Sequence, residues 1–261
     1  MTDLSGITAL VTGASSGIGA ALSEELAQRG VGRLILVARR AERLESMAAR
    51  LPGAIAHPAD LTRSADIATL LATWPDVDMV INNAGFGYRG RLESQESERL
   101  LSMVDLNCRA LLQLSHAWLP AMTANRRGWI LNVGSIVGFL PVPTSAVYAA
   151  SKAFVHSLTE AMRAETAGSG VRVHLLAPGP VPSEFFERAR GEARSRPSPL
   201  ATPPEAVARQ AIDDLLDGRA RRIPHQVVRL LAMAAAGTPM PLLRPLMVRI
   251  ASAGLSRSGR A

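Results

Sequence analysis

The chain has 261 residues, and 48% of them are hydrophobic. This length and composition exclude a disordered protein and suffice to fill the core of one large α/β domain. A single cysteine, Cys108, excludes an internal disulfide and a thiolate metal site, and we expect no bound metal. Residues 1–6 lead directly into an apolar run without the features of a secretory signal, so we expect a cytoplasmic protein.

The net charge of +7 is concentrated in the C-terminal part of the chain. No acidic residue follows Asp217, whereas eight arginines do: Arg219, Arg221, Arg222, Arg229, Arg244, Arg249, Arg257 and Arg260. Subtracting these eight positive charges from the net charge of +7 leaves a net charge of −1 for residues 1–217. The arginines lack interleaved aromatic residues or a recognisable module, so we expect no nucleic-acid binding.

Apolar runs typical of buried strands alternate with segments of helical periodicity up to residue 217. We predict strands at 7–13, 33–38, 54–60, 79–83, 129–135 and 171–177, and helices at 17–30, 41–51, 64–74, 97–123, around Tyr148 and at 205–216. This order predicts an α/β fold of the Rossmann type, in which helices cover both faces of a doubly wound parallel sheet.

The alternation is interrupted by a proline-rich segment and then ends. Between Pro178 and Pro204 we predict a loop with a short helix near 183–193. Beyond Asp217 we expect no further strand–helix unit. The chain is therefore predicted to form a single domain over 1–217, followed by a basic C-terminal extension over 218–261.

A glycine-rich turn joins the first predicted strand to its helix. Its glycines allow the backbone to approach a pyrophosphate closely, and the start of the helix supplies N–H groups and a positive dipole end. The glycine spacing differs from the common dinucleotide fingerprint, but its place between strand and helix favours a cofactor site. The predicted contacts in this turn are Gly13, Ser15, Ser16, Gly17, Ile18 and Gly19.

The end of the second predicted strand indicates which cofactor is preferred. An NAD enzyme would place a carboxylate here for the ribose 2′-hydroxyl, whereas this chain has Arg39 and Arg40. A guanidinium suits a 2′-phosphate, so we predict NADP rather than NAD. The alternative is that both arginines are solvated charges at the start of the next helix.

Tyr148 and Lys152 are the candidate catalytic pair. Lys152 is the only lysine of the chain, and it follows Tyr148 by four residues in a predicted helix. This spacing puts the phenol and the ammonium on one helix face, where the lysine is expected to lower the pKa of the phenol. A phenol so placed can donate a proton. The alternative is a half-buried tyrosine beside a solvated lysine.

Over residues 7 to about 217 the chain resembles the short-chain dehydrogenases/reductases. The resemblance rests on Thr12–Gly19, Asp60, Asn82–Gly85, Asn107, Ser135, Tyr148, Lys152 and Pro178–Gly179, in this order. It implies that Tyr148 exchanges a proton with a carbonyl or alcohol while Ser135 hydrogen-bonds the substrate oxygen. It further implies that Lys152 holds the nicotinamide ribose and that Asn107 holds a water linking Lys152 to solvent.

The same resemblance assigns the remaining cofactor contacts. Asp60 and Leu61 would meet the adenine, Asn83, Ala84 and Gly85 the adenosine side, and Pro178, Gly179 and Val181 the nicotinamide end. For Asn82 we favour a structural role between neighbouring strands. The resemblance implies an NADP-dependent oxidoreductase that interconverts a carbonyl and an alcohol, expected to be a homo-oligomer through the helices of Asn107 and Tyr148. A membrane-associated NADP-binding scaffold with little turnover is the alternative.

Two further patterns concern the substrate and the extension. The resemblance places five apolar residues at the mouth and lid of the pocket, which predicts an apolar substrate: Phe86, Phe139, Leu140, Phe185 and Phe186. The alternative is that some of them are core or lid-anchoring side chains. In residues 242–250 an apolar stripe flanked by Arg244 and Arg249 predicts a basic amphipathic helix. This helix either lies on an anionic membrane surface or packs against the domain or a second subunit, and we favour packing.

Overall fold

The computed structural model describes residues 3–182, 198–245 and 247–249. Its centre is a seven-stranded sheet in the order β3-β2-β1-β4-β5-β6-β7, in which all pairs are parallel. The strands are β1 (Thr8–Thr12), β2 (Arg33–Ala38), β3 (Ala54–Pro58), β4 (Met79–Asn82), β5 (Gly128–Val133), β6 (Val171–Leu176) and β7 (Arg221–Arg222). The predicted doubly wound α/β fold is thereby confirmed.

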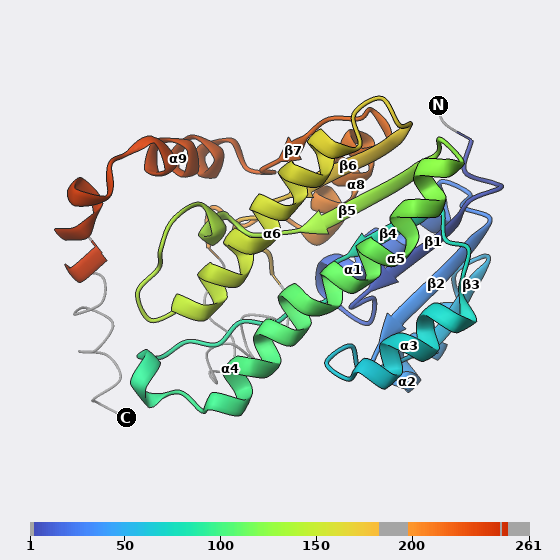
Figure 1. Cartoon of the computed structure of the whole chain (residues 1–261), viewed down its shortest axis with the longest axis horizontal. Coiled ribbons are helices and arrows are strands. Elements are labelled where there is room, and N and C mark those ends of the chain that lie inside the picture. Colours follow the sequence, from blue (N-terminus) through green and yellow to red (C-terminus); the bar gives the residue numbers. More distant parts are fainter. Residues whose placement is uncertain (1–2, 183–197, 246, 250–261) are drawn as a thin grey trace.

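Helices cover both faces of this sheet (Figure 1). The α-helices are α1 (Gly17–Gln28), α2 (Ala41–Ala48), α3 (Ser64–Thr73), α4 (Ser97–Val104), α5 (Leu111–Ala124), α6 (Ala146–Glu165), α8 (Pro204–Leu216) and α9 (Gln226–Gly237). Shorter helical segments are η1 (Leu92–Ser94), η2 (Asp105–Ala110) and η3 (Ile136–Phe139). The predicted short helix near 183–193 lies outside the described residues.

The buried strands alternate their side chains between two cores, as the period of a strand requires. Leu34 and Leu36 of β2 join the core that contains α1, α2 and α8, whereas Ile35 and Val37 join the core beneath α3 and α5. Both cores are apolar, which explains why the strands are near-continuous hydrophobic runs. The order of strands reverses between β1 and β4, and the carboxyl ends of these two strands bound a crevice there.

The segment predicted as one helix over 97–123 contains a π-helical turn. This turn, η2, separates α4 from α5 and carries Asn107, whose side chain is almost fully buried. Arg109 fixes the turn from outside, because its guanidinium donates to Asp105 Oδ1 at 2.8 Å and to the Thr62 carbonyl at 2.6 Å. The widened turn shifts the helix register at Asn107, a device found often at functional sites.

The sheet continues past Asp217, where we expected the alternation to end. Strand β7 pairs with β6 through Leu175↔Arg221 and Leu176↔Arg222. Two arginines form no apolar run, so periodicity could not reveal this strand. It is held instead by an ion pair, in which Arg222 Nη2 lies 2.7 Å from Oδ1 of the buried Asp214. The division of the chain at residue 217 remains a prediction.

We predict that Asp214→Asn lowers the free energy of unfolding by about 2–3 kcal/mol, because the substitution removes the charge that compensates Arg222 in a buried setting. Urea unfolding followed by circular dichroism measures the change. The control is Asp217→Asn, since Asp217 pairs with Arg219 at an exposed position. Equal effects of the two substitutions would contradict a special role for Asp214.

Candidate active site

A cleft of about 240 Å³ opens where the carboxyl ends of the parallel strands meet. Nearly every residue predicted for the site lines it: Gly13, Ser15, Ser16, Gly17, Ile18, Arg39, Arg40, Asp60, Leu61, Asn83, Ala84, Gly85, Ser135, Tyr148, Lys152, Pro178, Gly179 and Val181. Gly19 and Asn107 were predicted as well but lie outside the lining. The topology thus gathers residues from distant parts of the chain at one edge of the sheet.

The glycine-rich turn is shaped by close backbone approach. Gly13 and Gly17 adopt positive φ angles of 66° and 58°, which favour glycine. A side chain at Gly19 would overlap the Gly13 carbonyl oxygen and Asn83 Nδ2. Gly19 therefore permits the start of α1 to pack onto the turn rather than lining the cleft.

Thr12 ties the carboxyl ends of β1 and β4 together. Its hydroxyl accepts from the backbone N–H groups of Asn83 and Ala84, each at 2.9 Å, and donates to the Ile81 carbonyl at 3.2 Å. Asn83 Nδ2 in turn donates to the Thr12 carbonyl at 2.8 Å. We predicted no separate role for Thr12 from the sequence, although it directly precedes the first glycine of the turn.

Arg40 and Arg39 play different parts at the end of β2. The Arg40 guanidinium donates to the hydroxyls of Ser15 and Ser16 at 2.9 Å and 2.8 Å, which braces the glycine-rich turn. Because Ser16 occupies the N-cap of α1 without making a side-chain cap, the first N–H groups of the helix have no capping side chain. Arg39 reaches outward, with 65% of its side chain exposed and Nη1 3.9 Å from Asp60 Oδ2.

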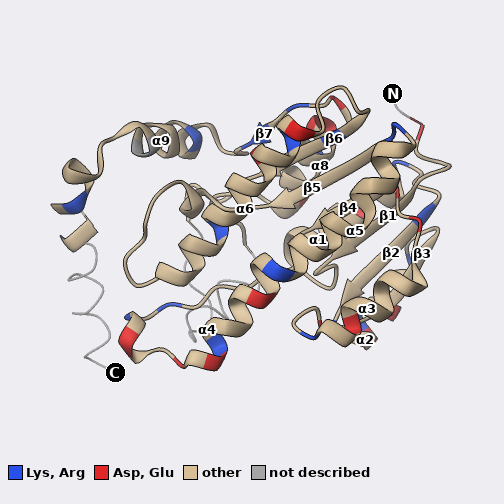
Figure 2. Cartoon of the chain, in the orientation of Figure 1, with Lys and Arg blue, Asp and Glu red and all other residues tan. Residues whose placement is uncertain are grey.

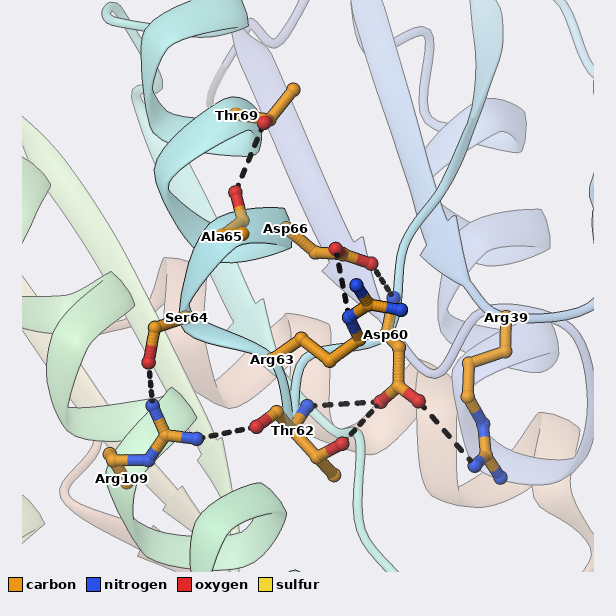
Figure 3. Close-up of polar contacts among 9 residues, drawn as sticks. All are labelled: Arg39, Asp60, Thr62, Arg63, Ser64, Ala65, Asp66, Thr69 and Arg109. Atoms are coloured by element: carbon orange, nitrogen blue, oxygen red, sulfur yellow. Dashed lines mark hydrogen bonds and ion pairs between the residues drawn. The ribbon is translucent and has the colours of Figure 1, made fainter.

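Asp60 forms the wall beside Arg39 (Figure 3). Its Oδ1 accepts from the backbone N–H of Thr62 at 3.0 Å and from the Thr62 hydroxyl at 2.8 Å. Burial alone would raise the pKa of the Asp60 carboxyl, but the Thr62 hydrogen bonds and the charges of Arg39 and Arg63 lower it below its usual value. The carboxylate therefore remains ionised and can accept hydrogen bonds at neutral pH.

Ser135, Tyr148 and Lys152 meet at the opposite end of the cleft. Ser135 lies two residues after the end of β5, and its side chain hydrogen-bonds the Tyr148 phenol. Lys152 is buried, and its Nζ donates to the Val133 carbonyl at 2.8 Å and lies 5.9 Å from the centroid of the Tyr148 ring. The alternative of a solvated lysine is therefore wrong.

The expected lowering of the Tyr148 pKa by Lys152 is not found in this geometry. Burial raises the pKa of Tyr148 to about 12, against the opposing effect of the Ser135 hydrogen bond. Burial also lowers the pKa of Lys152 to about 8. The ammonium is directed at the Val133 carbonyl rather than at the phenol oxygen, and helical spacing alone could not predict that direction.

Asn107 fastens the loop that follows β4 to helix α6. Its Nδ2 donates to the Phe86 carbonyl and to the Ser151 hydroxyl, each at 3.0 Å, and its Oδ1 accepts from the Phe86 N–H at 3.1 Å. A side chain at Gly85 would come within 2.8 Å of Asn107 Oδ1. Both amide hydrogens are thus donated to protein atoms, and only Oδ1 has capacity left for water.

Comparisons with known proteins decide the family. A family model described as short chain dehydrogenase matches residues 7–193. An uncharacterized oxidoreductase of Staphylococcus epidermidis is 35% identical over 199 residues, which cover 72% of this chain and 86% of the relative. The chain belongs to the short-chain dehydrogenase/reductase family, and it is an oxidoreductase of that family.

Two solved members of the family share the fold closely. A short-chain dehydrogenase from Sphingobium yanoikuyae in complex with NADPH has a TM-score of 0.80 and 34% identity, over 88% of this chain and 93% of that one. A bulky-bulky ketone specific alcohol dehydrogenase from Comamonas testosteroni has a TM-score of 0.76 and 30% identity, over 90% and 92% of the two chains.

His156 is a member of this short-chain dehydrogenase site that we did not predict from the sequence. Its Nε2 accepts a long hydrogen bond of 3.4 Å from the Ser135 N–H. The centroid of its ring lies 4.5 Å from the centroid of the Phe139 ring. Burial and the charges of Lys152 and Arg221 lower the pKa of His156 to about 4. The signal was present, because His156 follows Lys152 by four residues on the same helix face.

We predict that His156 makes the protein less stable in acid. Its pKa is about 4 in the folded chain and about 6.5 in the unfolded chain, so the unfolded chain binds the extra proton between these values. The free energy of unfolding should fall by up to about 3 kcal/mol as the pH drops from about 6.5 to about 4. His156→Gln should remove this part of the pH dependence in urea titrations.

The control for this prediction is His116→Gln, since His116 is exposed on α5. The free energy of unfolding of the His116→Gln variant should depend on pH in the same way as that of the unsubstituted protein. A His156→Gln profile that falls as steeply as the unsubstituted one would show that other groups cause the acid sensitivity.

Proposed function

We propose that the protein is an NADP(H)-dependent oxidoreductase that interconverts a carbonyl and an alcohol on an apolar small molecule. The observation that carries the proposal is the hydrogen bond of Ser135 to Tyr148 beside the buried Lys152, inside a cleft that begins at the uncapped N-terminus of α1. Bound NADPH would supply the hydride. The protein would orient the substrate, donate the proton and exclude water from the cleft.

The donor set of the cleft fits a dinucleotide. The first N–H groups of α1 have no capping side chain, and the first turn of α1 contains no acidic residue, so a pyrophosphate would meet a positive dipole end. Asp60 and Leu61 would hold the adenine, with Asn83, Ala84 and Gly85 along the adenosine. Pro178, Gly179 and Val181 line the same cleft near Tyr148 and would meet the nicotinamide.

Arg39 supports NADP over NAD. Its guanidinium is exposed at the rim of the cleft, and its contact with Asp60 at 3.9 Å is loose enough for a phosphate to compete. Arg40 would act indirectly, because its guanidinium holds the Ser15 and Ser16 hydroxyls. The Sphingobium relative was solved with NADPH, which agrees with this choice.

Proton transfer is assigned to Tyr148. With a pKa near 12 the phenol keeps its proton at neutral pH, so it can donate that proton to a carbonyl oxygen. Ser135 would hydrogen-bond the same oxygen, and Lys152, mostly protonated at neutral pH, would stabilise developing negative charge and bind the nicotinamide ribose. Asn107 would keep these side chains in position, because it hydrogen-bonds both the Phe86 backbone and Ser151 of α6.

The proposed substrate is apolar, although fewer side chains support this than expected. Phe86 lines the cleft, whereas Phe139 packs on His156 and Leu140 lines a separate surface cleft. Phe185 and Phe186 lie outside the described residues. The Comamonas relative is specific for bulky ketones, which favours a ketone here. No observation favours the alternative of a scaffold without turnover.

We also propose that the protein is a cytoplasmic homo-oligomer. Leu101 and Val104 of α4, Leu112 of α5 and Phe154 of α6 are exposed apolar side chains. They lie on or next to the helices of Asn107 and Tyr148, where we expected subunits to meet. Buried subunit contacts would remove this apolar surface from water.

We predict that Tyr148→Phe lowers the rate of ketone reduction about a hundredfold or more, because the general acid is lost, while NADPH binding changes little. NADPH oxidation is followed by absorbance over a panel of apolar ketones and aldehydes, and binding is followed by calorimetry. Tyr88→Phe is the matched control, since Tyr88 is the other tyrosine of the chain and should tolerate the change. Normal turnover by Tyr148→Phe would refute the mechanism.

We predict that Arg39→Asp weakens NADPH binding about tenfold or more and shifts the preference toward NADH, because a carboxylate repels the 2′-phosphate. Calorimetric titration with each cofactor measures both affinities. Arg50→Asp serves as the control, since it makes the same change of charge at an exposed arginine just after α2, outside the cleft lining. Unchanged NADPH affinity in Arg39→Asp would remove Arg39 from the site.

A further inference from the structure

Helix α9 packs on the catalytic domain with only one of its faces. Val228 and Ala232, four residues apart, are buried in a small core with Ala177 and Ile223, against which Phe139 also packs. A side chain at Gly179 would meet Val228 Cγ1 at 3.1 Å. The inner face of α9 therefore touches the loop that lines the cofactor cleft, and this part of the extension does pack on its own domain.

The opposite face of α9 is apolar and exposed. Val227, Leu230, Leu231 and Met233 are 48%, 67%, 59% and 60% exposed. At about 100° per residue, Leu230 lies opposite the midpoint of Val228 and Ala232, and the other three flank it within one broad arc. Arg229 lies at the border of that arc. We call these four apolar residues the outer face of α9.

The apolar surface continues into the next helical segment, which is described at residues 240–245 and 247–249. Met240, Leu242 and Val248 are exposed there, and Arg244 lies among them. This segment and α9 lie at the end of the molecule toward which the strands point (Figure 1). Several large apolar side chains gathered on two successive helices exceed the scattered apolar residues that a soluble surface normally carries.

The charge of the extension has a single sign. In Figure 2 the described parts of α9 and of the following helix carry blue for Lys and Arg but no red for Asp and Glu. The sequence agrees, since none of the residues after Asp217 is acidic. An apolar face bordered by arginines is complementary to the surface of an anionic membrane, where negatively charged headgroups cover an apolar interior.

We propose that the outer face of α9 and the exposed residues of the following helix form a binding site for an anionic lipid surface. A second copy of the same face is a poorer partner, because two-fold pairing would join two faces that are both bordered by arginines, and the extension has no Asp or Glu to compensate them. Apolar side chains would enter the headgroup region while the arginines meet lipid phosphates.

The proposed contact is peripheral. Among the described residues, none of the helices has the length and apolar character needed to cross a bilayer. Binding at the outer face would leave the inner face on the catalytic domain, so the cleft beside Gly179 would lie close to the lipid surface. Lipid binding does not require the proposed redox activity, and each can fail without the other.

Flotation of the full-length protein with vesicles tests the proposal. The protein should float with phosphatidylcholine vesicles that contain about 30% phosphatidylglycerol, should bind pure phosphatidylcholine at least about tenfold more weakly, and should be released at about 0.5 M salt. Leu230→Glu combined with Leu231→Glu should reduce binding to the anionic vesicles about tenfold or more. Leu92→Glu, at a leucine of η1 that is 56% exposed and lies outside both the cleft and the proposed subunit contact, should leave binding unchanged.

Charge and folding are tested separately. Arg229→Gln combined with Arg244→Gln should weaken anionic-vesicle binding about tenfold, whereas Arg33→Gln at the amino end of β2 should not, because it lies at the other end of the sheet. Thermal melting and NADPH binding establish that each variant is folded.

Three results would overturn the proposal. The first is absence of flotation with anionic vesicles, and the second is equal flotation with neutral ones. The third is a folded Leu230→Glu/Leu231→Glu variant that floats normally. Sedimentation that shows a dimer lost in that variant, without vesicle binding by the unsubstituted protein, would assign the outer face to a second copy instead.

Discussion

A buried ammonium group is the constraint on which the active site depends. Lys152 lies in the interior beside the cleft, and its charge is costly there unless it is compensated, as the lowering of its pKa to about 8 shows. The Val133 carbonyl at the end of β5 supplies its closest partner. Gly85 leaves the space next to the ammonium open, because a side chain at this position would lie 3.5 Å from Lys152 Nζ and closer still to Asn107. The position of α6 over the sheet is therefore tied to the ends of β4 and β5, and the Tyr148 phenol is delivered to the cleft by the same helix.

The remainder of the site is built by short polar links between strand ends. Thr12 joins β1 to β4, Arg40 braces the glycine-rich turn, and His156 supports Ser135 from below. Each link fixes backbone rather than substrate, so the cleft is shaped before any ligand enters. Helix α9 adds a link from the extension, because Val228 packs at Gly179. The extension is thus attached to the cofactor cleft on its inner side and exposes apolar residues on its outer side.

The sheet could be predicted from the sequence, because apolar runs encode buried strands directly. Many of the residues that line the cleft were named only through the resemblance to the short-chain dehydrogenases/reductases, and their roles toward a cofactor stay predictions. Features that depend on contacts between residues far apart in the sequence could not be predicted. Strand β7 consists of Arg221 and Arg222 and depends on the buried carboxylate of Asp214, which no periodicity reports. Phe139 was expected at the pocket mouth but packs on His156. Helical spacing placed Lys152 beside Tyr148 correctly, yet it could not show that the ammonium turns to Val133 or that burial raises the pKa of the phenol.

Transfer of labelled hydrogen tests the proposed redox activity most directly. The protein is incubated with NADPH that carries deuterium at the transferred position, together with a panel of bulky apolar ketones, and the alcohol products are analysed by mass spectrometry. We expect an alcohol that has gained one deuterium on the carbinol carbon, formed faster with NADPH than with equally labelled NADH. NADPH binding without alcohol formation from any ketone of the panel, or an alcohol that carries no deuterium, would contradict this activity.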